Sequence, residues 1–130
     1  MREELRELVE RAAALAVERK LSSECVAAEV GCALRTAAGH VFEGVNIDCA
    51  CGIGFCAEHS AIAAMVTQGE SHIRAIVAVG GDGRILPPCG RCREFILQVN
   101  RQNLNAEVII GPERVQTLAE LLPERWQERF

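Results

Sequence analysis

The sequence predicts an α/β fold, a three-layer α/β/α sandwich around a mixed central sheet. Two observations lead to it: an early pair of strand-like segments is joined by a short turn, and the later strand-like segments are separated by helical ones. A short turn gives an antiparallel hairpin, whereas strands separated by helices are joined by right-handed crossovers that place helices on the faces of a sheet. With 130 residues and a composition that is 49% hydrophobic, the chain has the size of a single domain, residues 1–130.

The first half of the chain predicts a helix followed by a hairpin. Residues 2–20 place apolar side chains three and four positions apart between Glu and Arg, as in an amphipathic helix. Residues 26–36 are rich in β-branched and small side chains, residues 37–39 can turn the chain, and residues 40–46 alternate again, which predicts two antiparallel strands. Residues 47–55 include two glycines and predict an irregular loop.

The second half predicts alternating helices and strands. Residues 73–79 are almost wholly apolar, as is typical of a central strand covered on both faces, and the glycine-rich residues 80–83 end it. Pro87-Pro88 favours the start of a helix. The remaining predicted elements are helices at residues 56–68, 89–100 and 118–122 and a strand at residues 106–110. The predicted order is α-β-β-α-β-α-β-α.

Composition and charge argue against several classes of partner. The formal net charge is −4 and the 14 Lys and Arg are scattered, which argues against nucleic acid. No apolar run approaches the roughly 20 residues of a membrane span, and the charged N-terminus is unlike a signal peptide, so a cytoplasmic protein without membrane contact is expected. In that compartment the seven cysteines are expected to stay reduced, binding metal or packing as small apolar side chains.

Two short motifs carry the chemistry, Cys56-Ala57-Glu58 and Pro88-Cys89-Gly90-Arg91-Cys92. A structural zinc site closes its tetrahedron with four protein ligands, whereas a catalytic site offers three and leaves one position to water. We therefore expect Cys56, Cys89 and Cys92 to bind Zn²⁺ with one position open. A C-x-x-C pair alone also fits a redox dithiol or half of a structural zinc knot. The preceding prolines and the distant Cys-Ala-Glu favour the catalytic site.

Glu58 is the expected acid and base of this site. It follows the first cysteine by two residues, on the first turn of a predicted helix. Zinc lowers the pKa of bound water from about 15.7 toward 7, and a carboxylate can take a proton and pass it to a leaving amine, as hydrolytic deamination requires. Taken alone, Glu58 also fits a solvent-facing charge at a helix start. His59 and Arg91 lie close enough in sequence to donate hydrogen bonds to the sulfurs.

From residue 30 to residue 126 the chain resembles the cytidine deaminase family. Besides the two cysteine motifs, the resemblance rests on Gly31-Cys32-Ala33-Leu34, Gly44-Val45-Asn46 and Leu118-Ala119-Glu120-Leu121-Leu122-Pro123. It implies a cytidine deaminase-like fold, zinc on the three cysteines of the motifs, and Glu58 as acid and base. For the small-chain branch of the family it also implies a homotetramer whose active sites are built across subunits.

The same resemblance implies substrate contacts. Asn46 would bind ribose, the Ala57 amide and the backbone near Pro87 would contact the pyrimidine edge, and Trp126 would close over a site. Without the resemblance, Asn46 fits a turn residue at a strand end, and Trp126 fits a side chain that covers the protein's own core.

Departures from the family pattern bear on the substrate. Asp48 stands where nucleoside-specific members usually carry Glu, His59 stands where an arginine is usual, and residues 25–29 hold no aromatic side chain. The arginine between the paired cysteines, Arg91, resembles the pattern of the related blasticidin S deaminases. The expected activity is deamination of a cytosine nucleoside to the uracil form with release of ammonia. The alternatives are a modified or aminoacylated cytosine nucleoside such as blasticidin S, and a non-catalytic zinc-stabilised domain.

Four cysteines lie outside the two motifs. Cys25 and Cys32 fall in strand-like stretches and are expected to be buried small residues. Cys49 and Cys51 form a C-x-C pair just before the site, where they could offer a spare ligand, but packing within the loop is the expected role.

Overall fold

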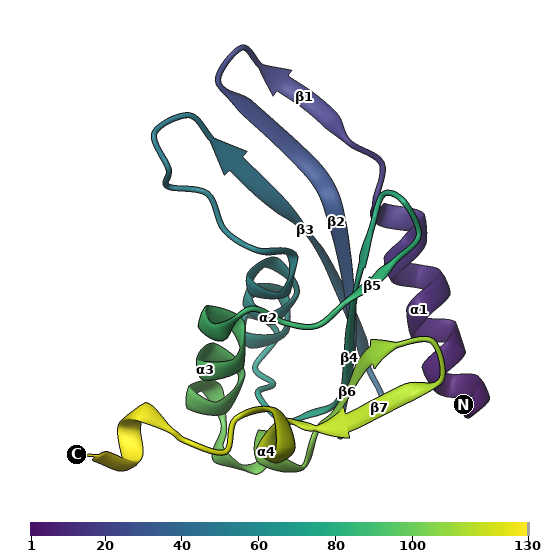
Figure 1. Cartoon of the computed structure of the whole chain (residues 1–130), viewed down its shortest axis with the longest axis vertical. Helices are drawn as coiled ribbons and strands as arrows, with labels where there is room; N and C mark the ends of the chain where they lie inside the picture. Colours follow the sequence, from purple (N-terminus) through teal and green to yellow (C-terminus); the bar gives the residue numbers. More distant parts are fainter. Residues whose placement is uncertain (130) are drawn as a thin grey trace.

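A seven-stranded mixed sheet forms the middle layer of the structure (Figure 1), a computed structural model that describes residues 1–129. The strands are β1 (Arg19–Ser22), β2 (Cys25–Thr36), β3 (Val41–Cys49), β4 (Ile73–Gly80), β5 (Ile85–Leu86), β6 (Glu107–Gly111) and β7 (Arg114–Thr117). They follow the order β1-β2-β4-β6-β7, with β3 paired to β2 and β5 paired to β4. Within the described residues, β4 and β6 form the one parallel pair.

Helices cover both faces of this sheet, which confirms the predicted three layers. Helix α1 (Glu3–Leu15) packs on one face, and α2 (Ala57–Thr67) and α3 (Gly90–Val99) pack on the other (Figure 1). Successive residues of a strand point to opposite faces, so each strand feeds both cores. Val77 of β4 joins the α1 core, and its neighbour Ile76 joins the core under α2 and α3. The remaining helices are short: η1 (Arg101–Asn105), α4 (Leu118–Leu121) and η2 (Trp126–Arg129).

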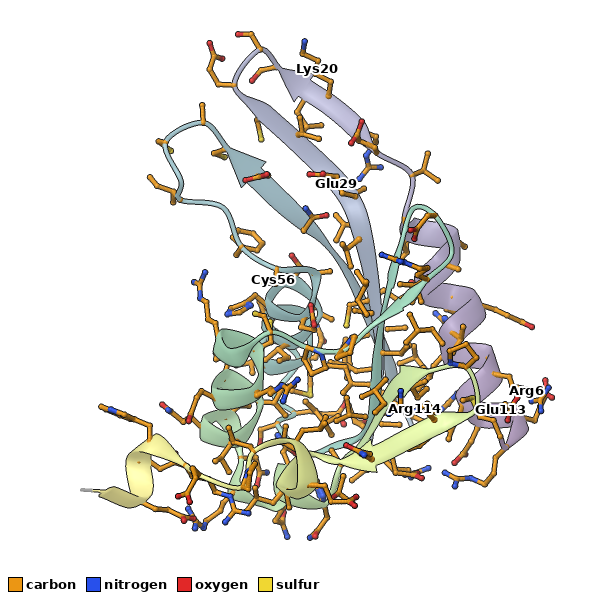
Figure 2. All side chains as sticks on the ribbon, viewed as in Figure 1. Arg6, Lys20, Glu29, Cys56, Glu113 and Arg114 are labelled. Carbon is orange, nitrogen blue, oxygen red and sulfur yellow. The ribbon has the colours of Figure 1, made fainter. Side chains whose placement is uncertain are left out.

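Ion pairs also attach α1 to the far end of the sheet. Arg6 Nη2 lies 3.3 Å from Glu113 Oε1 in the turn between β6 and β7, and Figure 2 shows both side chains at that edge. Both are well exposed, and exposed pairs contribute at most about 1 kcal/mol. The helix is therefore held mainly by its apolar face. No helix within residues 1–129 has both the length and the apolar character that crossing a membrane requires.

The N-terminal helix is shorter than predicted. Residues 2–20 were expected to be helical, but α1 ends at Leu15 and residues 19–22 form β1. The physical reason lies in the sheet: β4 pairs with β2 from Val30 onward, so the first residues of β2 present unpaired backbone groups that β1 satisfies.

Other differences are smaller. Strand β3 continues to Cys49 instead of ending at residue 46, because residues 47–49 pair with residues 25–27 of β2. Strands β5 and β7 were not predicted, since each is short and is formed by pairing with a longer neighbour. The helices predicted at residues 56–68, 89–100 and 118–122 and the strands at 73–79 and 106–110 are present within two residues of their predicted ends.

Gly44 sets the distance between β3 and α2. A Cβ atom built on Gly44 would lie 2.4 Å from both the Ala61 nitrogen and the Ser60 Cβ, closer than any non-bonded contact allows. Ser60 Oγ also donates a hydrogen bond to the Val45 carbonyl oxygen at 2.6 Å. Helix α2 therefore packs directly on the backbone of β3, and this contact positions the first residues of the helix.

We predict that Gly44→Ala destabilises the protein by about 3 kcal/mol, because the added methyl must push α2 away from β3. Urea unfolding followed by circular dichroism measures this change. The matched control is Gly81→Ala, whose Cβ would meet only ordinary contacts at 3.5 Å and beyond. Equal stability of the two variants would contradict the close approach.

Candidate active site

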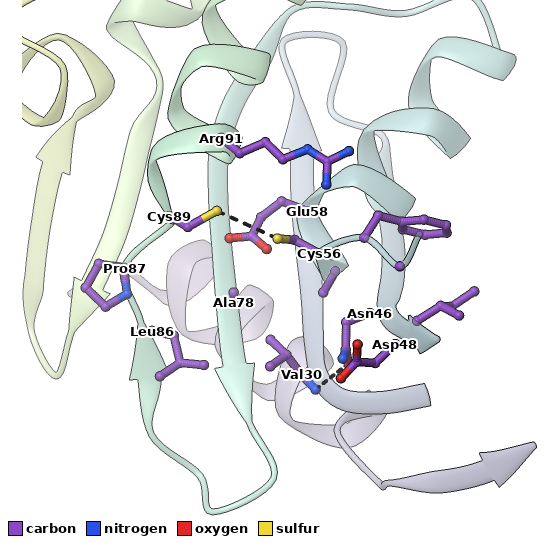
Figure 3. A pocket seen from close by; sticks show the side chains of 14 residues that line it. Val30, Asn46, Asp48, Cys56, Glu58, Ala78, Leu86, Pro87, Cys89 and Arg91 are labelled. Atoms are coloured by element: carbon purple, nitrogen blue, oxygen red, sulfur yellow. Dashed lines mark hydrogen bonds between the residues drawn. The ribbon is translucent and has the colours of Figure 1, made fainter. Parts of the chain in front are cut away.

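Three thiols meet where two helices begin. Cys56 is the N-cap of α2, Cys89 is the N-cap of α3, and Cys92 lies in the first turn of α3. Cys56 Sγ lies 3.7 Å from Cys89 Sγ, which lies 3.5 Å from Cys92 Sγ. Figure 2 places Cys56 at the start of α2, and Figure 3 shows it facing Cys89.

The spacing of these sulfurs fits zinc. Three thiolates on a tetrahedral zinc, each with a bond of about 2.3 Å, would lie about 3.8 Å apart. All three sulfurs lie within 4.8 Å of one another. The cluster offers three ligands. Because Cys92 is buried while Cys89 is exposed, one side of the cluster faces the solvent. The positive ends of two helix dipoles also point at the sulfurs and oppose their negative charge.

The thiols ionise unequally without a cation. Burial raises the pKa of Cys56 and that of Cys92, and the Glu58 charge raises the pKa of Cys92 further. Burial acts the same way on Cys89, yet its pKa is lowered overall because hydrogen bonds to its sulfur outweigh burial. The backbone N–H of Cys92 contributes most, followed by the thiols of Cys92 and Cys56 and the backbone N–H of Arg91. Three adjacent thiolates repel one another, so a divalent cation is what allows all three to ionise together.

Glu58 is the carboxylate closest in sequence to the cluster, and the structure buries it. It lies in the first turn of α2, its side chain faces Cys56 and Cys89 (Figure 3), and the residue is 6% exposed. Burial raises the pKa of Glu58. A carboxyl group with a raised pKa both accepts and releases protons nearer neutral pH than an exposed glutamate does, as proton transfer during hydrolysis requires.

An open pocket of about 370 Å³ leads to these groups. Its walls come from β2, β3, the loop before α2, and the segment between β5 and α3 (Figure 3). The lining residues are Val30, Asn46, Ile47, Asp48, Gly54, Phe55, Cys56, Ala57, Glu58, Ala78, Leu86, Pro87, Cys89 and Arg91. Such a volume suits a small molecule and not a folded partner.

Asn46 is oriented by an irregularity in the neighbouring strand. The register of β2 against β3 shifts between Ala27 and Gly31, and Ala28 in this bulge has a φ of 67°. The shift turns the Val30 N–H toward Asn46 Oδ1, which accepts its hydrogen bond at 2.9 Å (Figure 3). This bond orients the amide, and its Nδ2 group is the part of Asn46 that can donate to a ligand.

The pocket brings together most of the residues singled out from the sequence. Eight of them line it: Asn46, Asp48, Cys56, Ala57, Glu58, Pro87, Cys89 and Arg91. Cys92 is outside the lining of the pocket but belongs to the sulfur cluster. His59 contacts that cluster, with Nδ1 3.6 Å from Cys92 Sγ, and its ring stacks on Phe95 with the ring centroids 4.6 Å apart.

Trp126 lies apart from this pocket. It begins η2, is 61% exposed, and its backbone N–H donates to Glu94 Oε1 on α3. Sequence reasoning also missed Val30 and Phe55, which line the pocket. The available signal was the position of Phe55 next to the first zinc ligand.

Comparison with known proteins agrees with the fold and with zinc as the cofactor. The architecture and the three-thiol cluster define a zinc-dependent hydrolase of the α/β class. Residues 3–107 match the family described as the cytidine and deoxycytidylate deaminase zinc-binding region, and the chain belongs to this family. A cytidine deaminase of Mycobacterium tuberculosis (strain CDC 1551 / Oshkosh) is 34% identical over 96 residues, covering 73% of this chain and 70% of that protein.

Other relatives extend the comparison. The crystal structure of cytidine deaminase from Mycobacterium leprae superposes with a TM-score of 0.76 at 32% identity, covering 92% of this chain and 97% of that one. A blasticidin-S deaminase of Bacillus cereus is 37% identical over 76 residues, covering 52% of this chain and 54% of that protein. These similarities confirm the predicted family, fold class and zinc cofactor.

We predict that Cys89→Ser lowers the zinc content from about one ion per chain to a small fraction of that value, because two thiolates hold zinc far less tightly than three. Loss of the ion should also lower the thermal unfolding midpoint, as removal by a chelator should in the unsubstituted protein. Elemental analysis and a thermal melt measure the two effects. The control is Cys51→Ser, and full zinc retention by the Cys89 variant would contradict the ligand assignment.

Proposed function

We propose that this protein catalyses hydrolytic deamination of a cytosine nucleoside, cytidine or deoxycytidine, to the uracil nucleoside with release of ammonia. One observation carries the proposal: a buried carboxylate, Glu58, faces a cluster of three thiols at the inner end of a pocket sized for a small molecule. Family membership and the cytidine deaminases among its relatives support it.

In the proposed mechanism Cys56, Cys89 and Cys92 hold the zinc. When bound, zinc would supply the Lewis acidity that lowers the pKa of water toward neutral pH. Glu58 performs the proton transfers: it takes the proton of the attacking water and delivers it to the ring nitrogen. It then moves the proton of the new hydroxyl group to the exocyclic nitrogen, which leaves as ammonia while the carbonyl of the uracil forms. Its raised pKa suits a group that must both take and give a proton.

We assign contacts with the sugar and the base of the nucleoside to residues that line the pocket. We assign the sugar hydroxyls to Asn46 and Asp48, which lie on the same side of β3, two residues apart. The Ala57 amide and the backbone at Pro87 are assigned to the polar edge of the pyrimidine. Phe55 offers an apolar wall in a chain that lacks an aromatic side chain at residues 25–29.

His59 and Arg91 are assigned to balancing the charge of the sulfurs. Burial, and then the charge of Arg91, lower the pKa of His59, so the ring is neutral near pH 7. A neutral ring donates one hydrogen bond, which its Nδ1 can give to Cys92 Sγ. Arg91 brings a guanidinium group to the lining of the pocket.

The proposed biological setting is pyrimidine salvage in the cytoplasm, with a small nucleoside as substrate and no nucleic acid partner. We also propose a homotetramer in which Trp126 covers the pocket of a neighbouring subunit. Its high exposure and its distance from the lining of its own pocket support that role.

A substrate panel tests the reaction. Zinc-loaded protein should deaminate cytidine and deoxycytidine, seen as the change in ultraviolet absorbance from cytosine to uracil, with matching release of ammonia. Faster turnover of blasticidin S than of either nucleoside would contradict the proposed substrate class. Absence of turnover on every compound, with zinc bound, would indicate a non-catalytic domain.

We predict that Glu58→Gln lowers kcat about a thousandfold, because the amide fills the same space but carries no transferable proton. Zinc content should stay at the level of the unsubstituted protein, since Glu58 is not one of the clustered ligands. Steady-state kinetics and elemental analysis measure the two effects. Glu18→Gln, on an exposed residue outside the pocket, is the matched control. Near-normal kcat in the Glu58 variant would refute the role.

A further inference from the structure

Two cysteines that belong to neither zinc motif face each other on neighbouring strands. Cys25 begins β2 and Cys49 ends β3, and the two are direct partners in the antiparallel register. Side chains of direct partners point to the same face of a sheet. The Cys49 thiol donates a hydrogen bond to Cys25 Sγ at 3.7 Å, and both residues are partly exposed free thiols.

The backbone around this pair has the spacing that a disulfide needs. Partners in an antiparallel ladder alternate between hydrogen-bonded and non-hydrogen-bonded pairs. The Ala50 N–H bonds to the Glu24 carbonyl, so the adjacent pair, Cys25 and Cys49, is non-hydrogen-bonded. The Cys49 carbonyl accepts a hydrogen bond from the Gly52 N–H at 2.8 Å. Cα atoms of such pairs lie about 4.5 Å apart, within the range of about 4.4–6.8 Å spanned by disulfides.

We propose that Cys25 and Cys49 are a reversible thiol oxidation site, which a small disulfide such as glutathione disulfide converts to an intramolecular cross-strand disulfide. Closing the bond requires rotation of the two side chains and no change of strand register. In a reducing cytosol the thiols stay free, as expected from the sequence, and the bond forms when the oxidant accumulates.

The reaction is a two-step thiol–disulfide exchange. The hydrogen bond to Cys25 raises the pKa of Cys49, so Cys49 keeps its proton and the first attack falls to Cys25. The Cys25 thiolate breaks the S–S bond of glutathione disulfide, forms a mixed disulfide and releases one glutathione. Cys49 then gives up its proton, attacks the Cys25 sulfur and releases the second glutathione. Two protein thiols are oxidised by two electrons, and one glutathione disulfide is reduced to two thiols.

The location of the pair connects it to the pocket without involving zinc. Both cysteines lie at the free end of β2 and β3, which projects beyond the helices in Figure 1. Asp48, the residue before Cys49, lines the pocket on the opposite face of the strand. A disulfide would therefore fix the two strands at the rim of the pocket, while the thiols at the starts of α2 and α3 keep their metal.

The test is to map the bond in the zinc-loaded protein. The protein is equilibrated in oxidising and in reducing glutathione buffers, quenched with acid, alkylated and digested for mass spectrometry. In the oxidising buffer we expect two fewer alkylated thiols per chain and one linked peptide pair that joins Cys25 to Cys49. Dithiothreitol should restore both thiols, and the zinc content should not change. This measurement does not require turnover, so its result is independent of whether the proposed deamination is correct.

Serine variants sharpen this test. Cys25→Ser and Cys49→Ser should each abolish the linked pair, whereas Cys51→Ser, which removes the exposed thiol of the same C-x-C segment, should leave it intact. The proposal is overturned if Cys25 and Cys49 remain alkylated in the oxidising buffer. A bond that joins Cys51 to either residue, or zinc release with oxidation of Cys56, Cys89 or Cys92, would overturn it equally.

Discussion

The zinc site depends on one constraint: two helices must begin at the same point. Cys56 and Cys89 are separated by 33 residues, and they come within 3.7 Å because each caps a helix whose N-terminus faces the other. The same arrangement directs two helix dipoles at the sulfurs and puts Glu58, in the first turn of α2, beside the cluster. A single packing arrangement thus positions both the three sulfurs and the carboxylate to which proton transfer is assigned.

Each helix is held in place by a contact on its other side. Gly44 lets α2 rest on the backbone of β3, where Ser60 Oγ bonds to the Val45 carbonyl. A buried amide does the same for α3: Asn103 Nδ2 donates to the Ile96 carbonyl near the end of that helix, while Asn103 Oδ1 accepts from the Ile73 N–H at the start of β4. Both helices are therefore fixed to the central sheet by polar contacts as well as by the core.

The sequence sufficed to predict the parts of the site that are local. Cys56 and Cys89 each precede a helical pattern, so the helix starts and the three ligands could be predicted together. The rim of the pocket could not be predicted, because it depends on the register of β2 against β3. Nothing local marks Ala28 for a φ of 67°, yet the bulge there turns the Val30 N–H toward Asn46. Strand β1 was likewise mistaken for helix because its partner, the free end of β2, is a tertiary feature.

Six of the seven cysteines show how backbone environment decides the chemistry of one kind of side chain. Cys32, in the middle of β2, is fully buried, and burial, followed by the charge of Glu58, raises its pKa well above the usual value, so it packs as an apolar residue. The three thiols at the helix starts gain charge stabilisation from the dipoles and from zinc, which ties up their lone pairs. Cys25 and Cys49 are only partly buried, and their thiols face each other instead of a metal site. An oxidant that leaves the metal-bound sulfurs intact can therefore react first at the exposed end of the hairpin.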